Sequence, residues 1–417
     1  MIISIIMNYF FGIAMKKENK MRKAILTISI TANLLMLGIF KYAGFGAEML
    51  NNLPFISVAV PKIALPIGIS FYTFQAMSYV IDAYKSPAYI QRNPYKLALY
   101  ITFFPQLVAG PIVKYYDFAD QIDHRKHSPE QTANGIKRFI FGLSKKLIIA
   151  NTMAMAADYV YGLDTADISL PLAWLGAISY LFQIYFDFSG YSDMAIGLGA
   201  MFGFEFKENF NYPYISQSMQ DFWRRWHISV STWFKEYLYI PLGGNRKGKV
   251  RTALNKLAVF FCTGLWHGAS LNFIVWGLIN GFFMMFESYN IINVKKWFRP
   301  IRHVYTIFVT LIAFVFFRAN NISDACQFIG KMFNPTSNSS EKTAMFLQQL
   351  TPMFLVMIVM AIIFSMPIFQ MLQSKIKSKK ALAVGEVCSY GISIVMLLIC
   401  VLTLSSSSYN PFIYFRF

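Results

Sequence analysis

Long apolar stretches recur along the chain and alternate with short polar or basic ones. Many are roughly 18 residues or more, which is long enough for a helix to cross a bilayer. The predicted spans lie at about residues 1–15 (the end of a span), 24–42, 58–81, 139–160, 170–204, 304–317, 346–372 and 384–404. Together with the central region 220–281, the pattern predicts an all-α polytopic transmembrane bundle of about ten spans, with boundary errors of a few residues. We interpret residues 1–417 as one integral-membrane domain.

Two apolar stretches are interrupted by proline and glycine. The stretch 58–81 contains Pro66 and Gly68, and residues 97–113 contain Pro105 and Gly110. Backbone groups freed at membrane depth must be satisfied inside the protein or in a cavity. Both segments are therefore expected inside the bundle, and the second is expected to line a cavity.

Basic runs set the expected orientation. The runs 16–23 and 375–380 are rich in lysine and belong on the cytoplasmic side by the positive-inside rule. With one span after the second run, residues 405–417 are expected on the outer side.

Composition narrows the class further. The chain is 56% hydrophobic and 14% charged, whereas soluble domains carry about 25% charged residues. The net charge of +18 does not indicate nucleic acid, because lysine and arginine in a membrane protein collect in cytoplasmic loops and at lipid headgroups.

His267 is the leading candidate for catalysis. It is the ionisable group in the apolar run 257–281 and lies between Trp266 and Gly268. Ionisable residues inside spans are costly, and a histidine can exchange a proton near neutral pH. We predict that it is a general base that takes a proton from an attacking alcohol; the alternative is a core histidine hydrogen-bonded between helices.

His227 is the second candidate. It follows Trp223, Arg224 and Arg225 in a segment that mixes tryptophan and arginine, as interfacial amphipathic helices do. Continuous helical spacing would place Trp223, Val230 and Ser231 beside it. A catalytic role and a role as an interface residue both remain open on this pattern.

Two carboxylates, Asp187 and Asp193, lie within the predicted span 170–204. They need water, a proton or a cationic partner at membrane depth. Arg224 and Arg225 are the cations we expect to supply that pairing.

Two further patterns are decoys. Gly243 and Gly248-Lys249 have P-loop spacing, but Val250 replaces the hydroxyl that would hold Mg²⁺. The basic residues of this loop suit an anionic donor or headgroups instead. His124 and His127 lack a further ligand pattern, so we expect a solvated loop and no metal site.

The C-terminal residues 410–417 are strongly aromatic. An aromatic belt anchor explains them at a membrane interface. Tyr414 is nevertheless a phenol able to accept and pass on an acyl group if the tail reaches the site.

Several motifs together resemble the membrane-bound O-acyltransferase family over nearly the whole chain. They are residues 65–75, 105–111, 187–193, 208–214, 221–227, 233–244 and 266–268. The match is closest to the branch that acetylates alginate and peptidoglycan. The resemblance implies a helical bundle with a central funnel, His267 at its narrowest point, His227 at the second family position and Tyr414 in a tail that relays the acyl group. The residues expected to bind substrate are Trp223, Arg224, Arg225, Trp266, Asp187, Asp193 and Asn272.

The resemblance also implies a reaction. An acyl group, typically acetyl, is taken on the cytoplasmic side from acetyl-CoA or a carrier-protein thioester, with no bound cofactor. It is delivered to a hydroxyl of a cell-surface polysaccharide or of an extracytoplasmic partner transferase, at a bacterial-type plasma membrane. The alternatives are D-alanyl transfer to teichoic acid, a lipid or glycan transporter, and a scaffold that recruits the partner. Family members usually begin with about two further apolar segments, so this chain is expected to start inside a span.

Overall fold

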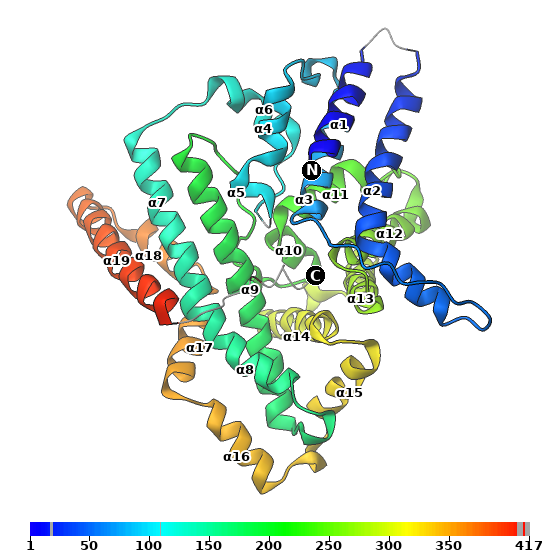
Figure 1. The fold of residues 1–417 in the computed structure, drawn as a ribbon. Coiled ribbons are helices and arrows are strands. Elements are labelled where there is room, and N and C mark those ends of the chain that lie inside the picture. The colour runs from blue at the N-terminus through cyan, green and yellow to red at the C-terminus, as the bar shows by residue number, and fades with distance from the viewer. Residues whose placement is uncertain (17–19, 109, 407–411, 413–417) are drawn as a thin grey trace.

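A computed structural model gives the fold, and it describes residues 1–16, 20–108, 110–406 and 412. The described residues form helices joined by loops, with no strand among them (Figure 1). The all-α prediction is confirmed.

Seven long helical elements build the bundle. They are α2 (Arg22–Asn51), α7 (Pro129–Ser144) continued by the π-helical η2 (Lys145–Ala150) and α8 (Asn151–Tyr161), α9 (Leu170–Met201), α12 (Gly248–His267), α13 (Leu271–Ser288), α14 (Arg299–Arg318) and α19 (Lys379–Ser406). Shorter helices fill the space between and around them. They are α1 (Ile2–Ala14), α3 (Ile69–Lys85), α4 (Pro94–Thr102), α5 (Phe104–Leu107), α6 (Tyr115–His124), α10 (Met219–Arg225), α11 (Ile228–Phe234), the π-helical η5 (Lys235–Tyr239), α15 (Ile322–Met332), α16 (Ser340–Gln349), α17 (Pro352–Phe364) and α18 (Ile368–Lys375).

The number of spans differs from the expectation. Among the described residues, 5 helices are long and apolar enough to cross a membrane, or 6 if the bent pair α16 and α17 is one span. The count of about ten is not confirmed, because proline and glycine break expected spans into shorter pieces. Residues 56–66 have no regular structure before α3, and residues 97–108 and 110–113 divide between α4, α5 and irregular segments.

Glycines let α7 and α9 approach closely. A Cβ at Gly142 would lie 2.5 Å from the carbonyl oxygen of Gly190, and one at Gly190 would lie 2.6 Å from that of Gly142. Gly135 and Gly197 form a second reciprocal pair, at 2.6 Å in each direction. Small residues of this kind allow helix backbones to meet in a membrane.

Replacing Gly190 with alanine is expected to destabilise the bundle by about 1–3 kcal/mol, because the added methyl group forces two backbones apart. The midpoint of thermal unfolding of the full chain measures this effect. Gly391→Ala in α19 is the matched control, because no heavy atom lies within 4 Å of the position that its new methyl group would take. Equal midpoints for the two variants would contradict the packing argument.

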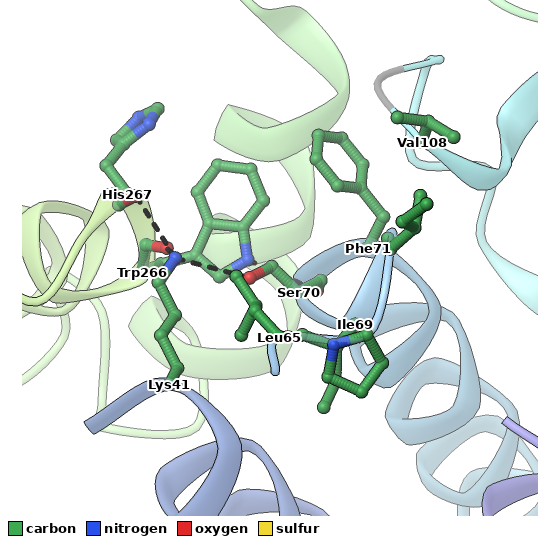
Figure 2. Close-up of a pocket in the computed structure, with 11 residues that line it drawn as sticks. Lys41, Leu65, Ile69, Ser70, Phe71, Val108, Trp266 and His267 are labelled. Carbon is green, nitrogen blue, oxygen red and sulfur yellow. Dashed lines mark hydrogen bonds between the residues drawn. The ribbon is translucent and has the colours of Figure 1, made fainter. Parts of the chain in front are cut away.

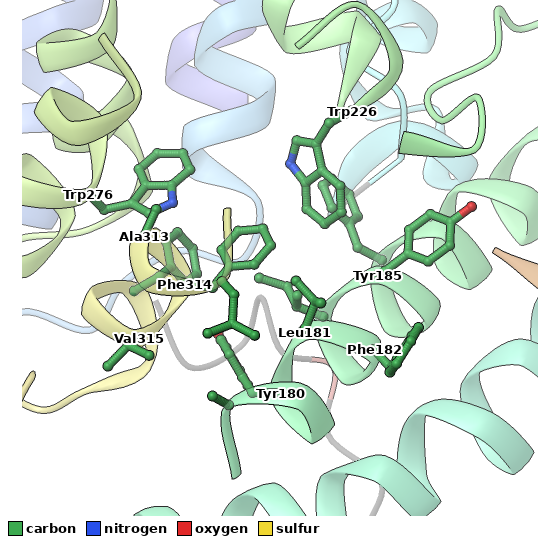
Figure 3. Packing of buried hydrophobic residues seen from close by; sticks show 14 of the residues in the cluster. Tyr180, Leu181, Phe182, Tyr185, Trp226, Trp276, Ala313, Phe314 and Val315 are labelled. Carbon is green, nitrogen blue, oxygen red and sulfur yellow. The ribbon is translucent and has the colours of Figure 1, made fainter. Parts of the chain in front are cut away.

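Aromatic residues form the main core. Tyr180 of α9 packs edge-on against Phe314 of α14, and the ring of Tyr185 of α9 lies 6.2 Å from that of Trp226 (Figure 3). The ring centroids of Trp226 and Phe314 are 5.3 Å apart. This packing fixes the segment around Trp226, which leads directly into His227.

The start of α2, the end of α3 and η5 lie at one end of the bundle. Arg22 donates a hydrogen bond to the carbonyl of Tyr84, and the ammonium of Lys85 lies 4.6 Å from the ring centroid of Tyr237. From the loop after η5, α12 runs for 20 residues, or about 30 Å. It therefore carries its last residue, His267, away from this end.

Candidate active site

His267 is the last residue of α12 and is 6% exposed. Three aromatic rings surround its imidazole edge-on, with centroid distances of 4.9 Å to Trp266, 4.9 Å to Trp276 and 5.2 Å to Phe317. These rings come from α12, α13 and α14, so the imidazole lies where three helices meet.

A cavity of about 190 Å³ reaches this residue. Its lining includes Lys41, Ser70, Phe71, Trp266 and His267. Figure 2 shows the imidazole turned away from the other labelled lining residues. The cavity has room for water, and substrate contact with the imidazole requires a side-chain movement from the arrangement in this structure.

His227 lies at a break between α10 and α11. Its backbone is in the left-handed region, with φ 42° and ψ 56°, which is strained for a residue with a Cβ. The break is held by two backbone hydrogen bonds, from Asn211 N to Arg225 O and from Ile228 N to Asn209 O, each 2.9 Å. The prediction of continuous helical spacing through His227 is therefore wrong.

Asn209 fixes the proton on His227. Its Oδ1 accepts from the backbone N–H of Ser229 at 3.2 Å and from the Ser229 hydroxyl at 2.9 Å, while its Nδ2 donates to Ser192. Because that oxygen is the acceptor, Nδ1 of His227, 3.1 Å away, must be the donor. Nε2 then carries the lone pair, and it has no hydrogen-bond partner within the described part of the chain.

Both histidines lie beside Trp266. The ring centroid of Trp266 is 6.0 Å from that of His227 and 4.9 Å from that of His267. The Trp266 indole donates to the carbonyl of Ser70 at 3.3 Å. Sequence reasoning chose these three residues from separate motifs, and the structure brings them together.

A second cavity, of about 340 Å³, approaches from the end of the bundle that carries η5. Arg224, Lys235 and Lys256 make its lining basic, and Trp223 and Phe260 form an apolar wall. The Trp223 ring is 5.8 Å from that of Trp276, which in turn contacts His267. Trp223 and Arg224 thus line the same cavity. An anion with an apolar portion needs both a cation and an apolar surface in its binding site.

A third cavity, of about 450 Å³, is lined by charged residues of both signs and by Ile228 and Ser229, which follow His227. An ion pair between Lys114 and Glu236, 2.9 Å long, lies in its wall. Polar side chains therefore also border the segment that holds His227.

The two carboxylates of α9 have other partners than those expected. Asp187 is buried and paired with Lys146. Asp193 pairs with Arg138 at 2.8 Å and with Lys145 at 2.6 Å. The predicted pairing with Arg224 and Arg225 is wrong because α7 and η2, packed along α9, supply the cations.

Arg225 and Asn272 hold the backbone in place. Arg225 bonds Asp221 at 3.1 Å and the carbonyl of Asn211 at 3.2 Å. Asn272 donates to the carbonyl of Ala319 at 2.7 Å, which ties α13 to the end of α14. These contacts are structural, and substrate binding by either residue stays a prediction.

Tyr414 lies outside the described residues. Phe412, two positions earlier, is described, and its ring lies 4.4 Å from that of Tyr191 and 5.1 Å from the ammonium of Lys146. Tyr191 is three residues after Phe188 of α9, whose ring is 4.6 Å from that of His227. Phe412 therefore contacts Tyr191, which lies about one helical turn after Phe188, a residue that contacts His227.

The loop with P-loop spacing follows the helical η5 rather than a strand. His124 and His127 are exposed, and no group of three or more metal-ligating side chains occurs among the described residues.

Sequence reasoning missed several residues of this centre. Asn209 and Trp276 have no distinguishing signal, since amides and tryptophans are common in such chains. Lys41 and Lys256 do have one: each is a cation within an apolar helix, which costs free energy unless it has a partner or a function.

The chain is similar to known proteins over most of its length. A model described as MBOAT, membrane-bound O-acyltransferase family, matches residues 13–326. The probable alginate O-acetylase AlgI of Azotobacter vinelandii is 39% identical, covering 99% of this chain and 89% of the relative. The peptidoglycan O-acetyltransferase of Helicobacter pylori is 35% identical over 88% of this chain and 76% of its own length. The teichoic acid D-alanyltransferase of Bacillus subtilis is 30% identical over 60% of this chain and 66% of its own length.

Proposed function

Because the chain belongs to the membrane-bound O-acyltransferase family and is thus an acyltransferase, we propose that it transfers acetyl from a thioester donor to a hydroxyl of a cell-surface polysaccharide. The hydroxyl belongs to the polysaccharide itself or to an extracytoplasmic partner transferase that passes the group on. The names of the alginate and peptidoglycan relatives support a polysaccharide acceptor. The observation that carries the proposal is the pair of buried histidines that both contact Trp266.

In the proposed reaction, the acceptor oxygen attacks the thioester carbonyl carbon and the carbon–sulfur bond breaks. His267 takes the hydroxyl proton as general base and returns it to the leaving thiolate. Nε2 of His227, the nitrogen that Asn209 leaves without a proton, accepts a hydrogen bond from a second hydroxyl of the acceptor and so orients the attacking one. The products are an ester and a free thiol, so no net proton is released.

The basic cavity suits the donor. Coenzyme A and carrier-bound phosphopantetheine both place phosphate at one end of a long thioester arm. Arg224, Lys235 and Lys256 would bind the phosphate, and the wall of Trp223 and Phe260 would contact the arm. Trp223 leads through Trp276 to His267, so the thioester end would point to the catalytic residue.

Arg224→Ala and Lys256→Ala are each expected to raise the KM for acetyl-CoA about tenfold, the effect of losing about 1.4 kcal/mol of charge-assisted binding. The kcat should change little, since the charges lie far from the reacting carbonyl. Initial rates in membrane vesicles that contain the full chain measure both constants. Lys380→Ala, at the exposed start of α19, is the control. An unchanged KM in both cavity variants would reject this donor site.

The membrane sides that we propose for the donor and the acceptor follow from the distribution of basic residues and from the direction of α12. The basic run 16–23 precedes α2 and is placed in the cytoplasm by the positive-inside rule. The donor cavity is at that end of the bundle, whereas His267 lies at the far end of α12, beside Lys41, about two thirds of the way along α2. A donor from the cytoplasm and an acceptor from outside would meet there, at a plasma membrane of bacterial type.

Tyr414 remains a proposed relay residue. The packing of Phe412 on Tyr191 supports a tail that approaches the centre. D-Alanyl transfer is the weaker alternative, because that relative matches only 60% of this chain. A purely transporting or scaffolding role does not suit a member of an acyltransferase family. Acetyl esters on the surface polymer of cells with and without this chain test the proposal.

A further inference from the structure

The last turn of α12 has carbonyl groups that the helix itself cannot satisfy. An α-helix leaves its last four carbonyls without an intrahelical donor. Glycine after a helix often solves this by taking a left-handed conformation, but Gly268 is extended, with φ −170° and ψ 159°. Hydrogen-bond donors for these carbonyls must therefore come from other parts of the chain.

Two neighbouring residues of α2 supply them. The Lys41 ammonium donates to the carbonyls of Trp266 at 2.6 Å and His267 at 3.1 Å, as the dashed lines in Figure 2 show. The Tyr42 hydroxyl donates to the carbonyl of Leu265. Three consecutive carbonyls are thus capped by side chains more than 220 positions away in the sequence.

The ammonium of Lys41 is fully occupied. Its third hydrogen bond goes to the hydroxyl of Ser70 at 3.3 Å, and an ammonium has three N–H groups. Lys41 is therefore not a free cation that waits for a substrate, although it lines the cavity at His267. Its positive charge also lies at the negative end of the α12 macrodipole, which is a favourable position.

We propose that Lys41 and Tyr42 are positioning residues for the reaction, which clamp the last turn of α12 and so set where the imidazole of His267 lies. Both residues donate hydrogen bonds to backbone carbonyls of this turn. The clamp joins α2 to the end of the catalytic helix, while Trp266 is tied to Ser70 at the start of α3. A displacement of about 1 Å in a catalytic group can reduce a rate about 100-fold.

The clamp predicts a specific kinetic result. In vesicles with the full chain and acetyl-CoA as donor, Lys41→Met should lower kcat about 10- to 100-fold and leave the donor KM within about twofold, since the donor cavity is separate. Lys41→Arg, which keeps the charge and the donors, should recover most of the loss. Tyr42→Phe should lower kcat less, and Lys23→Met at the exposed start of α2 should match the wild type.

A second readout does not depend on activity. Hydrogen exchange of the purified full chain should be faster in the last turn of α12 for Lys41→Met and Tyr42→Phe, and unchanged for Lys23→Met, because uncapped helix ends open more readily. This inference rests on the proposed acyl transfer only for its kinetic arm. If the wild-type chain shows no acetyl transfer, the proposed function is rejected. The hydrogen-exchange measurement then decides the clamp on its own.

Two results would overturn the clamp: unchanged exchange in the last turn of α12, or a wild-type kcat in Lys41→Met where the wild type is active. A loss in Lys41→Met that Lys41→Arg does not restore would also count against it. If Lys41→Met does not accumulate in membranes, Tyr42→Phe decides, since it removes one oxygen atom. In Tyr42→Phe, faster hydrogen exchange in the last turn of α12 together with a lower kcat supports the clamp. Exchange and kcat equal to those of the wild type overturn it.

Discussion

Replacing His267 with alanine is expected to lower the rate of acyl transfer at least about 1,000-fold. General base catalysis contributes about 10²- to 10⁴-fold. The rings of Trp266, Trp276 and Phe317, which surround the imidazole, cannot take up a proton in its place. His267→Gln should lose as much activity while filling the space better, so the loss can be separated from a packing defect. Rates in vesicles, normalised to the amount of chain in the membrane, measure the effect.

The matched control is His124→Gln, which removes an exposed histidine at the end of α6. It should keep wild-type activity. If His267→Gln retained more than about a tenth of the wild-type rate, a loss smaller than general base catalysis supplies, His267 would not be the base.

Replacing His227 with alanine is expected to lower the rate about 100-fold, the lower end of what a proton-handling side chain contributes. The structure adds a sharper test through Asn209, which holds Nδ1–H of His227 and leaves Nε2 as the acceptor. Asn209→Leu removes that acceptor and should lower kcat about tenfold or more, since the wrong tautomer of a catalytic histidine is poorly active. Asn209→Asp still accepts from Nδ1–H, so it should retain most of the activity.

The contrast between the two Asn209 variants is the informative measurement. Equal activity for Asn209→Leu and Asn209→Asp would mean that the tautomer of His227 is unimportant. His227 would then be a packing residue between Phe188 and Trp266, whose rings lie 4.6 Å and 6.0 Å from it.

The sequence was sufficient to predict a helical membrane protein and to single out three residues that lie together in it, Trp266, His227 and His267. Ionisable groups in apolar runs are rare enough to single out His267, and the motif around His227 is distinctive. Residue type and local spacing do not show how a chain turns, however. The break at His227 depends on Asn209 and Asn211, which bond to Ile228 and Arg225 from a preceding loop.

The sequence also did not reveal which residues distant along the chain form ion pairs or hydrogen bonds with one another. Asp187 and Asp193 were recognised as costly, but their cations come from α7 and η2, which pack on α9 through Gly142 and Gly190. From the sequence, Arg224 and Arg225 looked equally suitable as cationic partners. The same limit hides the contact of Lys41 with Trp266, which joins residues 225 positions apart.

The most direct test of the central claim is the acetyl ester content of the surface polymer in cells that lack the native copy of this chain. Those cells should regain esters when they express the wild-type chain, and should fail to regain them with His267→Gln or His227→Ala at the same membrane level. Wild-type ester content with both histidine variants would contradict acyl transfer at the histidine pair beside Trp266.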